Sequence, residues 1–226
     1  MDGQFVPTKT FDHNKIKELR PLTVIPFDSH LMISEPVKHV KDYVEAGSDI
    51  ITVHAEVCDE SSFGEIHDLL KQNQVGVGLA INPDTDIPEW SYKFLPTLDQ
   101  IIVMSVVPGK SGQKYIPETH EKMAKLSSIL NEHKFTGYIE ADGGVNLENI
   151  GSCFEDGARA FVGGGAIIGQ TDVRAAIREF REQVLQSRRR ILIEKAHHLG
   201  GSELANKWIG LHIVGKKKDQ LIKIAK

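Results

Sequence analysis

Apolar stretches recur along the first three quarters of the chain at intervals close to 25 residues, with one longer step before the fifth. Most of them are continuous apolar runs rather than alternating ones. A run of this kind is typical of a β-strand that is covered on both faces. We therefore predict six buried strands, at 24–28, 50–54, 75–81, 100–106, 138–141 and 160–162.

Segments with helical periodicity separate these strands. Pro36 and Gly47 stand where one such segment should start and stop, and Asp12 and Asn146 stand where helix caps are expected. Strands that alternate with helices at this period predict βα units around a parallel sheet. The predicted helices lie at 13–20, 36–46, 62–71, 87–94, 117–132 and 147–155.

The fold class that this pattern favours is an α/β protein with a (β/α)8 TIM barrel. The six predicted strands are two fewer than eight, and the shortfall is expected at the front, so we predict a barrel that is incomplete at its N-terminus. A doubly wound open sheet is the alternative. It is disfavoured because no Gly-x-Gly-x-x-Gly motif follows a first strand.

A long amphipathic helix is predicted after the last strand. Thr171 and Asp172 form its expected cap, and Gly200-Gly201 end it. The remaining residues are interpreted as two further short helices. We predict a barrel domain at 1–185 and a C-terminal helical extension at 186–226, which could cover the open barrel in place of a second subunit.

Composition narrows the class of protein. The 226 residues carry a formal net charge of −4, and 26% of them are charged, which is ordinary for a soluble protein. Nothing in this balance indicates binding to nucleic acid or to an anionic membrane surface. No apolar run approaches the length of a membrane span. Cys58 and Cys153 have no Cys-x-x-Cys spacing, so we expect reduced thiols in a cytoplasmic protein.

Chemically useful residues stand where the predicted strands end. Asp142 ends one strand and is followed at once by Gly143-Gly144, and the next strand runs into Gly163-Gly164-Gly165. Backbone N–H groups in such turns can bind an anion, so the pattern indicates a phosphate cradle with a carboxylate beside it. The alternative is a pair of tight turns that merely need glycine. The C-terminal rim is where barrels keep their active sites.

Seven segments in order resemble the ribulose-phosphate 3-epimerase family. The resemblance runs from Met1 to about Gln183, and no single segment carries it alone. The matching segments are MDGQFVP at 1–7, DSHLM at 28–32, TVHAE at 52–56, GLAINPDT at 78–85, VMSVVPGKSGQKYIP at 103–117, EADGGVN at 140–146 and GARAFVGGGAI at 157–167.

The resemblance implies a divalent metal (Zn, Fe, Mn or Co) held by two histidines and two aspartates, with two aspartates moving the proton. It makes Asp142 both a catalytic acid/base and a metal ligand, and His30 a metal ligand. The alternatives are a carboxylate that only stabilises its turn and a structural histidine. The implied substrate-binding residues are His30, Gly109, Lys110, Ser111, Gly112, Asp142, Gly143, Gly144, Gly164 and Gly165.

The chain also departs from the family's pattern. The family carries a His-x-Asp pair just before its MDG, whereas this sequence begins at that Met. Half of the metal site and the second acid/base are therefore expected in an upstream segment, either because the start was set too late or because the sequence is a piece. Lys110 and Ser111 stand where the family usually has Phe-Gly, and Gly165 stands where it usually has Ser.

The expected function is epimerisation of D-ribulose 5-phosphate to D-xylulose 5-phosphate, by metal-assisted proton abstraction beside the ketone through an enediolate. One alternative is a catalytically impaired barrel that binds a sugar phosphate. Another is an epimerase or synthase for a related ketose phosphate such as allulose 6-phosphate. The expected partners are a ketopentose phosphate and a second copy of the chain. His54 and Glu56 are expected behind the ligands or against substrate.

Overall fold

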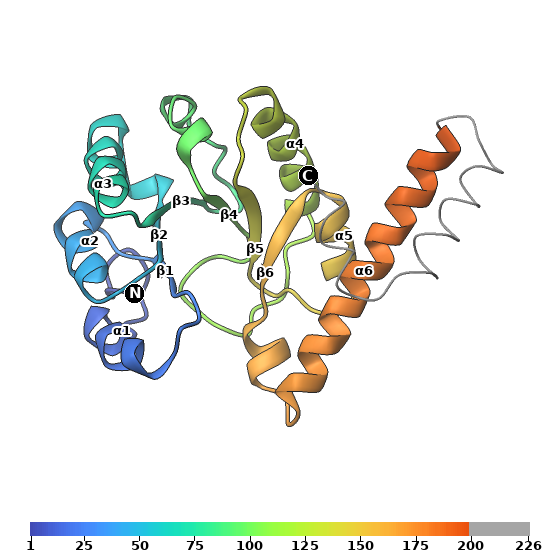
Figure 1. Cartoon of the computed structure of the whole chain (residues 1–226), viewed down its shortest axis with the longest axis horizontal. Coiled ribbons are helices and arrows are strands. Elements are labelled where there is room, and N and C mark those ends of the chain that lie inside the picture. The colour runs from blue at the N-terminus through green and yellow to red at the C-terminus, as the bar shows by residue number, and fades with distance from the viewer. Residues whose placement is uncertain (199–226) are drawn as a thin grey trace.

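The computed structural model describes residues 1–198 and contains one parallel sheet within them. The strands follow one another in chain order, which excludes a doubly wound sheet because its order would reverse. Figure 1 shows them as an arch rather than a flat sheet. The six strands of this region are β1 (Asp28–Leu31), β2 (Ile50–His54), β3 (Gly76–Ile81), β4 (Gln100–Met104), β5 (Tyr138–Asp142) and β6 (Ala158–Val162).

The helices lie along the outside of the arch, with α2 and α3 on one flank and α4, α5 and α6 on the other (Figure 1). Within residues 1–198, β1 and β6 pair with β2 and β5 but not with each other. The predicted incomplete (β/α) barrel is therefore confirmed as a curled half-barrel. The helices are α1 (His13–Leu19), α2 (Pro36–Glu45), α3 (Glu60–Gln72), α4 (Thr119–Glu132), α5 (Ile150–Glu155) and α6 (Val173–His198).

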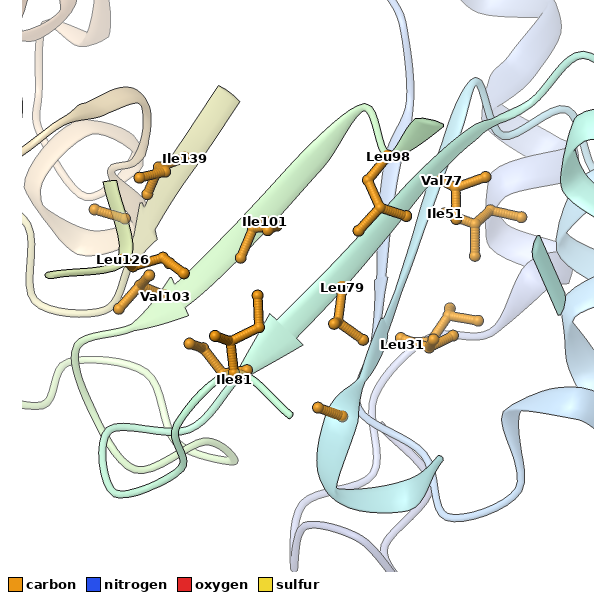
Figure 2. Packing of buried hydrophobic residues seen from close by; sticks show 14 of the residues in the cluster. Leu31, Ile51, Val77, Leu79, Ile81, Leu98, Ile101, Val103, Leu126 and Ile139 are labelled. Atoms are coloured by element: carbon orange, nitrogen blue, oxygen red, sulfur yellow. The ribbon is translucent and has the colours of Figure 1, made fainter. Parts of the chain in front are cut away.

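The hydrophobic core fills the space between the outer face of the sheet and the helices. Figure 2 shows strand residues of this layer, such as Leu79 of β3 and Ile101 of β4, among other members of the same cluster. A fully buried side chain of this size stabilises the fold by about 1.5–3 kcal/mol relative to an exposed one. The inner face of the arch holds a smaller apolar cluster of Val6, Met32, Ala80, Ile102, Met104 and Val106.

Aspartates begin three of the helices. Asp12 accepts a hydrogen bond from the Asn14 N–H, as its predicted capping role requires. Asp59 and Ser62 form a capping box at the start of α3. Asp172 accepts from the Ala175 N–H at the start of α6, where the sequence predicted it. Each cap satisfies a backbone donor that the first helical turn leaves free.

The prediction of a first strand at 24–28 was wrong by several residues, because β1 begins only at Asp28. Val24 and Ile25 are largely exposed. The guanidinium of Arg20 donates to the carbonyls of Thr23 and Ile25, so these acceptors are used locally and not in a sheet. Pro26 between them and the strand also lacks the N–H that a ladder needs.

One predicted helix is absent and another begins later than expected. The segment 87–94 is not an α-helix but contains a 3-10 turn at Glu89–Ser91, followed by another at Leu95–Thr97. Proline at 88 and at 96 explains the break. The helix predicted from residue 147 begins at Ile150, because the Asn146 side chain accepts from the N–H groups of Glu148 and Asn149 and forms a turn first.

Helix α6 runs without interruption through the predicted domain boundary at 185/186, so that boundary stays a prediction. Ala176, Phe180 and Ser187 lie on its buried face. The two short helices predicted for the tail lie outside the described residues. None of the helices within residues 1–198 is long and apolar enough to cross a membrane.

Candidate active site at the carboxyl rim of the sheet

A cavity of about 440 Å³ opens at the carboxyl ends of β4, β5 and β6, and we call it the rim pocket. The loops after these three strands form most of its wall. Every substrate-binding residue predicted from the sequence lines it except His30. The predicted residues that meet there are Gly109, Lys110, Ser111, Gly112, Asp142, Gly143, Gly144, Gly164 and Gly165.

The backbone around Asp142 is fixed by the neighbouring loop after β4. The Ser105 N–H donates to the Asp142 carbonyl at 2.7 Å, and the Ser105 hydroxyl donates to the Gly143 carbonyl at 2.6 Å. Gly143 and Gly144 have φ values of +120° and +63°, which favour glycine. A Cβ on Gly144 would also lie 2.5 Å from the backbone nitrogen of Tyr115. The turn therefore requires glycine, and it holds the carboxylate beside the pocket.

Gly164 and Gly165 follow β6, and the fold gives no steric reason for glycine there. No atom of the described residues lies within 4 Å of the position that a Cβ would take on either of them, and neither has a positive φ. Because both line the rim pocket, a side chain on them would extend into pocket space. Bare backbone in this position suits close approach of an anion to N–H groups.

The loop after β4 carries the predicted contact residues Gly109 to Gly112. The Thr8 hydroxyl donates to the Gly109 carbonyl. The Gln113 amide donates to the carbonyls of Val107 and Lys110 at 2.6 and 2.9 Å, and these two hydrogen bonds within the loop stabilise its conformation. Lys110 is exposed and lines the rim pocket, so a positive charge is available there.

Three methionines form part of the wall of the rim pocket. Met1, Met32 and Met104 line the rim pocket, and Met32 and Met104 are buried. Their thioethers make this part of the pocket wall apolar and polarizable.

His30 does not line the rim pocket itself but contacts Asp142, which does. Its Nδ1 lies 3.2 Å from the Asp142 Oδ2, although the two residues are 112 positions apart in the sequence. Their side chains are only 14% and 18% exposed. His30 itself lines a neighbouring cavity of about 580 Å³ beside β1, so it stands between the two cavities.

The structure adds two residues behind His30 that the sequence prediction left without a defined role. The Nε2 atoms of His30 and His54 are 2.9 Å apart, and His54 Nδ1 lies 3.0 Å from the Glu56 carboxylate. Burial lowers the pKa of His54. Burial alone would raise the pKa of Glu56, but hydrogen bonds from His54 and from the Asn82 N–H lower it to about 2. The VHxE pattern of 53–56 was the available sequence signal.

A divalent metal would find only part of a site here. An imidazole and a carboxylate suit such ions, and adjacent ligands of one metal lie about 3–3.5 Å apart, which matches the 3.2 Å between His30 Nδ1 and Asp142 Oδ2. Among the described side chains, however, no group of three or more histidines, cysteines, aspartates and glutamates is arranged to hold a metal ion. The described residues thus fit two ligand positions and not a complete set.

Two further carboxyl groups lie away from the rim, Glu140 in the middle of β5 and Asp28 at the exposed start of β1. Burial, with Asp28 and Asp142 nearby, raises the pKa of Glu140 to about 8. Partial desolvation of its carboxylate also raises the pKa of Asp28, although the residue is exposed, and this carboxylate accepts from Gln100 at 2.8 Å. No strong sequence signal marks this pair, and Glu140 stands only two residues before Asp142 in the same strand.

Comparison with known proteins gives a consistent result for most of the chain. The family model described as the ribulose-phosphate 3 epimerase family matches residues 1–168. The ribulose-phosphate 3-epimerase of Bacillus subtilis (strain 168) is 38% identical over 182 residues, which is 80% of this chain and 82% of that protein. The ribulose-phosphate 3-epimerase of Escherichia coli (strain K12) is 36% identical over 185 residues, 81% of each chain.

Solved structures support the fold at lower identity. A 3-hexulose-6-phosphate synthase from Salmonella typhimurium matches with a TM-score of 0.59 at 18% identity, covering 77% of this chain and 81% of that one. A 3-keto-L-gulonate-6-phosphate decarboxylase from Vibrio cholerae matches with a TM-score of 0.54 at 16% identity, covering 77% and 79%. At such identities the likeness shows the fold and nothing about substrate.

Proposed function

Because the chain belongs to the ribulose-phosphate 3-epimerase family, a family of isomerases, we propose that it interconverts D-ribulose 5-phosphate and D-xylulose 5-phosphate at the rim pocket. The observation that carries this proposal is the position of Asp142. Its carboxylate stands beside a pocket walled by bare glycine backbone, on a turn that Ser105 holds in place. A fixed acid/base next to an anion cradle is what proton transfer on a sugar phosphate needs.

The phosphate end of the substrate suits the glycine turns. The N–H groups around Gly143-Gly144 and Gly164-Gly165 are the candidate donors, and Lys110, which lines the same pocket, adds a positive charge. Binding at that end would direct the sugar carbons toward Asp142 and the methionine wall. The apolar wall would keep water from the reacting carbon.

Asp142 then acts on the carbon beside the ketone. Its carboxylate takes the proton as the C–H bond breaks, and the electron pair of that bond forms the C=C of an enediolate. An acid on the opposite face returns a proton to the same carbon with inverted configuration. The resemblance puts that second acid in the His-x-Asp segment. A divalent cation held by His30 and Asp142 would supply positive charge to the enediolate oxygens.

Asp142→Asn tests the assignment. The amide cannot accept the proton, so epimerase activity should fall at least about 100-fold while thermal unfolding is unchanged, because the carboxylate lies at the rim and not in the core. Asp68→Asn is the matched control, since its side chain is 74% exposed on α3. Activity of Asp142→Asn within about tenfold of the parent would remove Asp142 from the mechanism.

A second candidate is a barrel that binds a sugar phosphate but turns it over poorly. The observation behind it is that the described side chains bring together two candidate metal ligands and one rim acid/base. Exchange of solvent deuterium into the substrate separates the two ideas. Binding by calorimetry without deuterium incorporation supports the second candidate, and rapid incorporation contradicts it.

A further inference from the structure

Four side chains at the rim contact one another in sequence, and they come from β5, β1, β2 and the residues directly after β2. Asp142 on β5 contacts His30 on β1, His30 contacts His54 on β2, and His54 contacts Glu56 directly after β2. The distances are 3.2, 2.9 and 3.0 Å. His54 is fully buried, so its ring has no exchange partner in bulk water.

The two imidazoles meet edge to edge. Their planes differ by 17° and their centroids are 4.9 Å apart, while the Nε2 atoms are only 2.9 Å apart. Rings stacked face to face could not bring two ring nitrogens this close, so the contact is a hydrogen bond in which one Nε2 donates and the other accepts. Phe5 packs on the His54 ring with centroids 4.7 Å apart, which keeps that ring from turning.

Glu56 is anchored from the opposite side. Its Oε1 accepts from the Asn82 N–H at 2.7 Å, which leaves Oε2 for His54. The carbonyl of Asn82 in turn accepts from Lys122 on α4, which also binds the carbonyls of Pro83 and Thr85. Glu56 is therefore bound to the loop after β3, and Lys122 of α4 fixes that loop in turn. The position of the Glu56 carboxylate is thus well defined.

The proton positions follow from this arrangement. An ionised carboxylate can only accept, so Oε2 of Glu56 requires a proton on Nδ1 of His54. A neutral His54 with its proton on Nδ1 presents a bare Nε2. His30 must then donate its Nε2–H to His54, and in a neutral His30 the Nδ1 keeps a free electron pair that faces Asp142.

From this geometry we infer that Glu56 is a positioning residue, which acts through His54 to fix the ring and the tautomer of His30 so that Nδ1 faces Asp142. The consequence for catalysis rests on the proposed function, while the tautomers themselves do not. A free Nδ1 pair is what a cation shared with Asp142 would bind. A protonated Nδ1 would instead donate to the carboxylate and close that position.

Glu56→Gln gives the sharpest test, because the Asn82 N–H decides how the new amide lies. A backbone N–H can only donate, so the glutamine oxygen stays on Asn82 and its NH₂ group turns to His54. His54 Nδ1 must then accept, its proton moves to Nε2, and His30 carries its proton on Nδ1. One substitution of nearly equal size therefore reverses both tautomers.

The measurement is the ¹H–¹⁵N long-range correlation spectrum of the imidazoles in the metal-free, substrate-free protein. We expect His54 to be protonated on Nδ1 in the parent chain and on Nε2 in Glu56→Gln. Glu60→Gln, a nearby glutamate paired with Lys93 at the surface, should leave both spectra as in the parent. A parent His54 protonated on Nε2 overturns the inference by itself, even where the variant does not fold, and so does an unchanged tautomer in a folded Glu56→Gln.

Two functional measurements complete the design. Divalent-metal affinity and kcat should fall about 10- to 100-fold in Glu56→Gln, while KM stays within about threefold because the glycine turns are untouched. Reversed tautomers with unchanged metal affinity and unchanged kcat would refute the positioning role. If Glu56→Gln reverses the tautomers but Asp142→Asn leaves activity intact, the proposed function fails and the tautomer assignment stands.

Discussion

The side-chain amide of Gln100 reaches across β3 and donates a hydrogen bond of 2.6 Å to the Thr52 hydroxyl on β2. The same nitrogen donates to Asp28 on β1 at 2.8 Å, so one amide connects three strands. Gly78 of β3 pairs with Thr52 on one side and with Gln100 on the other. A Cβ at Gly78 would lie 2.0 Å from the Thr52 hydroxyl and 2.9 Å from the Gln100 Cγ. The glycine is what lets this buried polar layer form.

Gly78→Ala should therefore destabilise the fold by roughly 1–3 kcal/mol, because both close atoms belong to buried side chains that would have to give up their hydrogen bond. Urea unfolding followed by circular dichroism measures the change. Gly64→Ala in α3 is the control, since its nearest atom is 3.7 Å from the new Cβ and alanine favours a helix by up to about 1 kcal/mol. Equal shifts in the two variants would show that the polar layer adds nothing.

Glu140 predicts a pH dependence of stability. Its pKa is raised by burial to about 8 in the folded chain, against 4.5 in its ordinary state. The folded protein thus binds a proton that the unfolded chain has released, and stability should fall as the pH rises from about 5 to 8. The loss attributable to this group is roughly 2–4 kcal/mol over that range.

Glu140→Gln should flatten this slope, because an amide cannot ionise. The variant should be more stable than the parent at pH 8 and close to it at pH 5, measured as urea midpoints at several pH values. Glu45→Gln, whose side chain is 66% exposed on α2, is the control and should keep the slope of the parent. A parent whose stability rises between pH 5 and pH 8 would contradict the raised pKa.

The sequence allowed the sheet to be predicted because its strands are long apolar runs at regular spacing. Five of the six predicted strands overlap β2 to β6, and their order follows from the βα alternation. The first strand was misplaced because Val24 and Ile25 look like strand residues, while the contact that removes them from the sheet comes from Arg20. A contact between a side chain and backbone carbonyls has no periodic sequence pattern, so it could not be predicted.

The candidate site was predictable only where one residue marks a strand end. Asp142 and the glycines after it could be predicted as site residues, because a carboxylate and bare backbone follow an apolar run. The roles of Glu56 and Lys122 could not be predicted, because they depend on the contact between α4 and the loop at Asn82. Tertiary packing decides that contact. The raised pKa of Glu140 likewise arises mainly from its burial in the folded arch, which the sequence does not show.

Gly164→Val should weaken sugar-phosphate binding without weakening the fold. No described atom lies within 4 Å of the new Cβ, and the side chain extends into the rim pocket. The affinity for inorganic phosphate and for the sugar phosphate should fall at least about tenfold by calorimetry, or about 1.4 kcal/mol. Gly165→Ser is the matched control, because the family usually has serine there, and it should keep its affinity. An affinity of Gly164→Val equal to that of the parent chain would place the phosphate elsewhere.

The last prediction concerns the metal ligands. His30 and Asp142 offer two ligand atoms 3.2 Å apart, and a complete structural or catalytic site uses three or four from the protein. Joining a family-type segment that carries His-x-Asp in front of Met1 should therefore raise zinc affinity more than tenfold, since it adds an imidazole and a carboxylate. Turnover should rise by about 100- to 10,000-fold, because the segment also supplies the second acid/base. The same segment with alanine at both positions is the control, since it adds the strand without the ligands. Calorimetry with zinc and a coupled epimerase assay on all three chains decide the matter, and gains as large with the alanine segment as with His-x-Asp would assign the effect to closure of the barrel and not to the ligands.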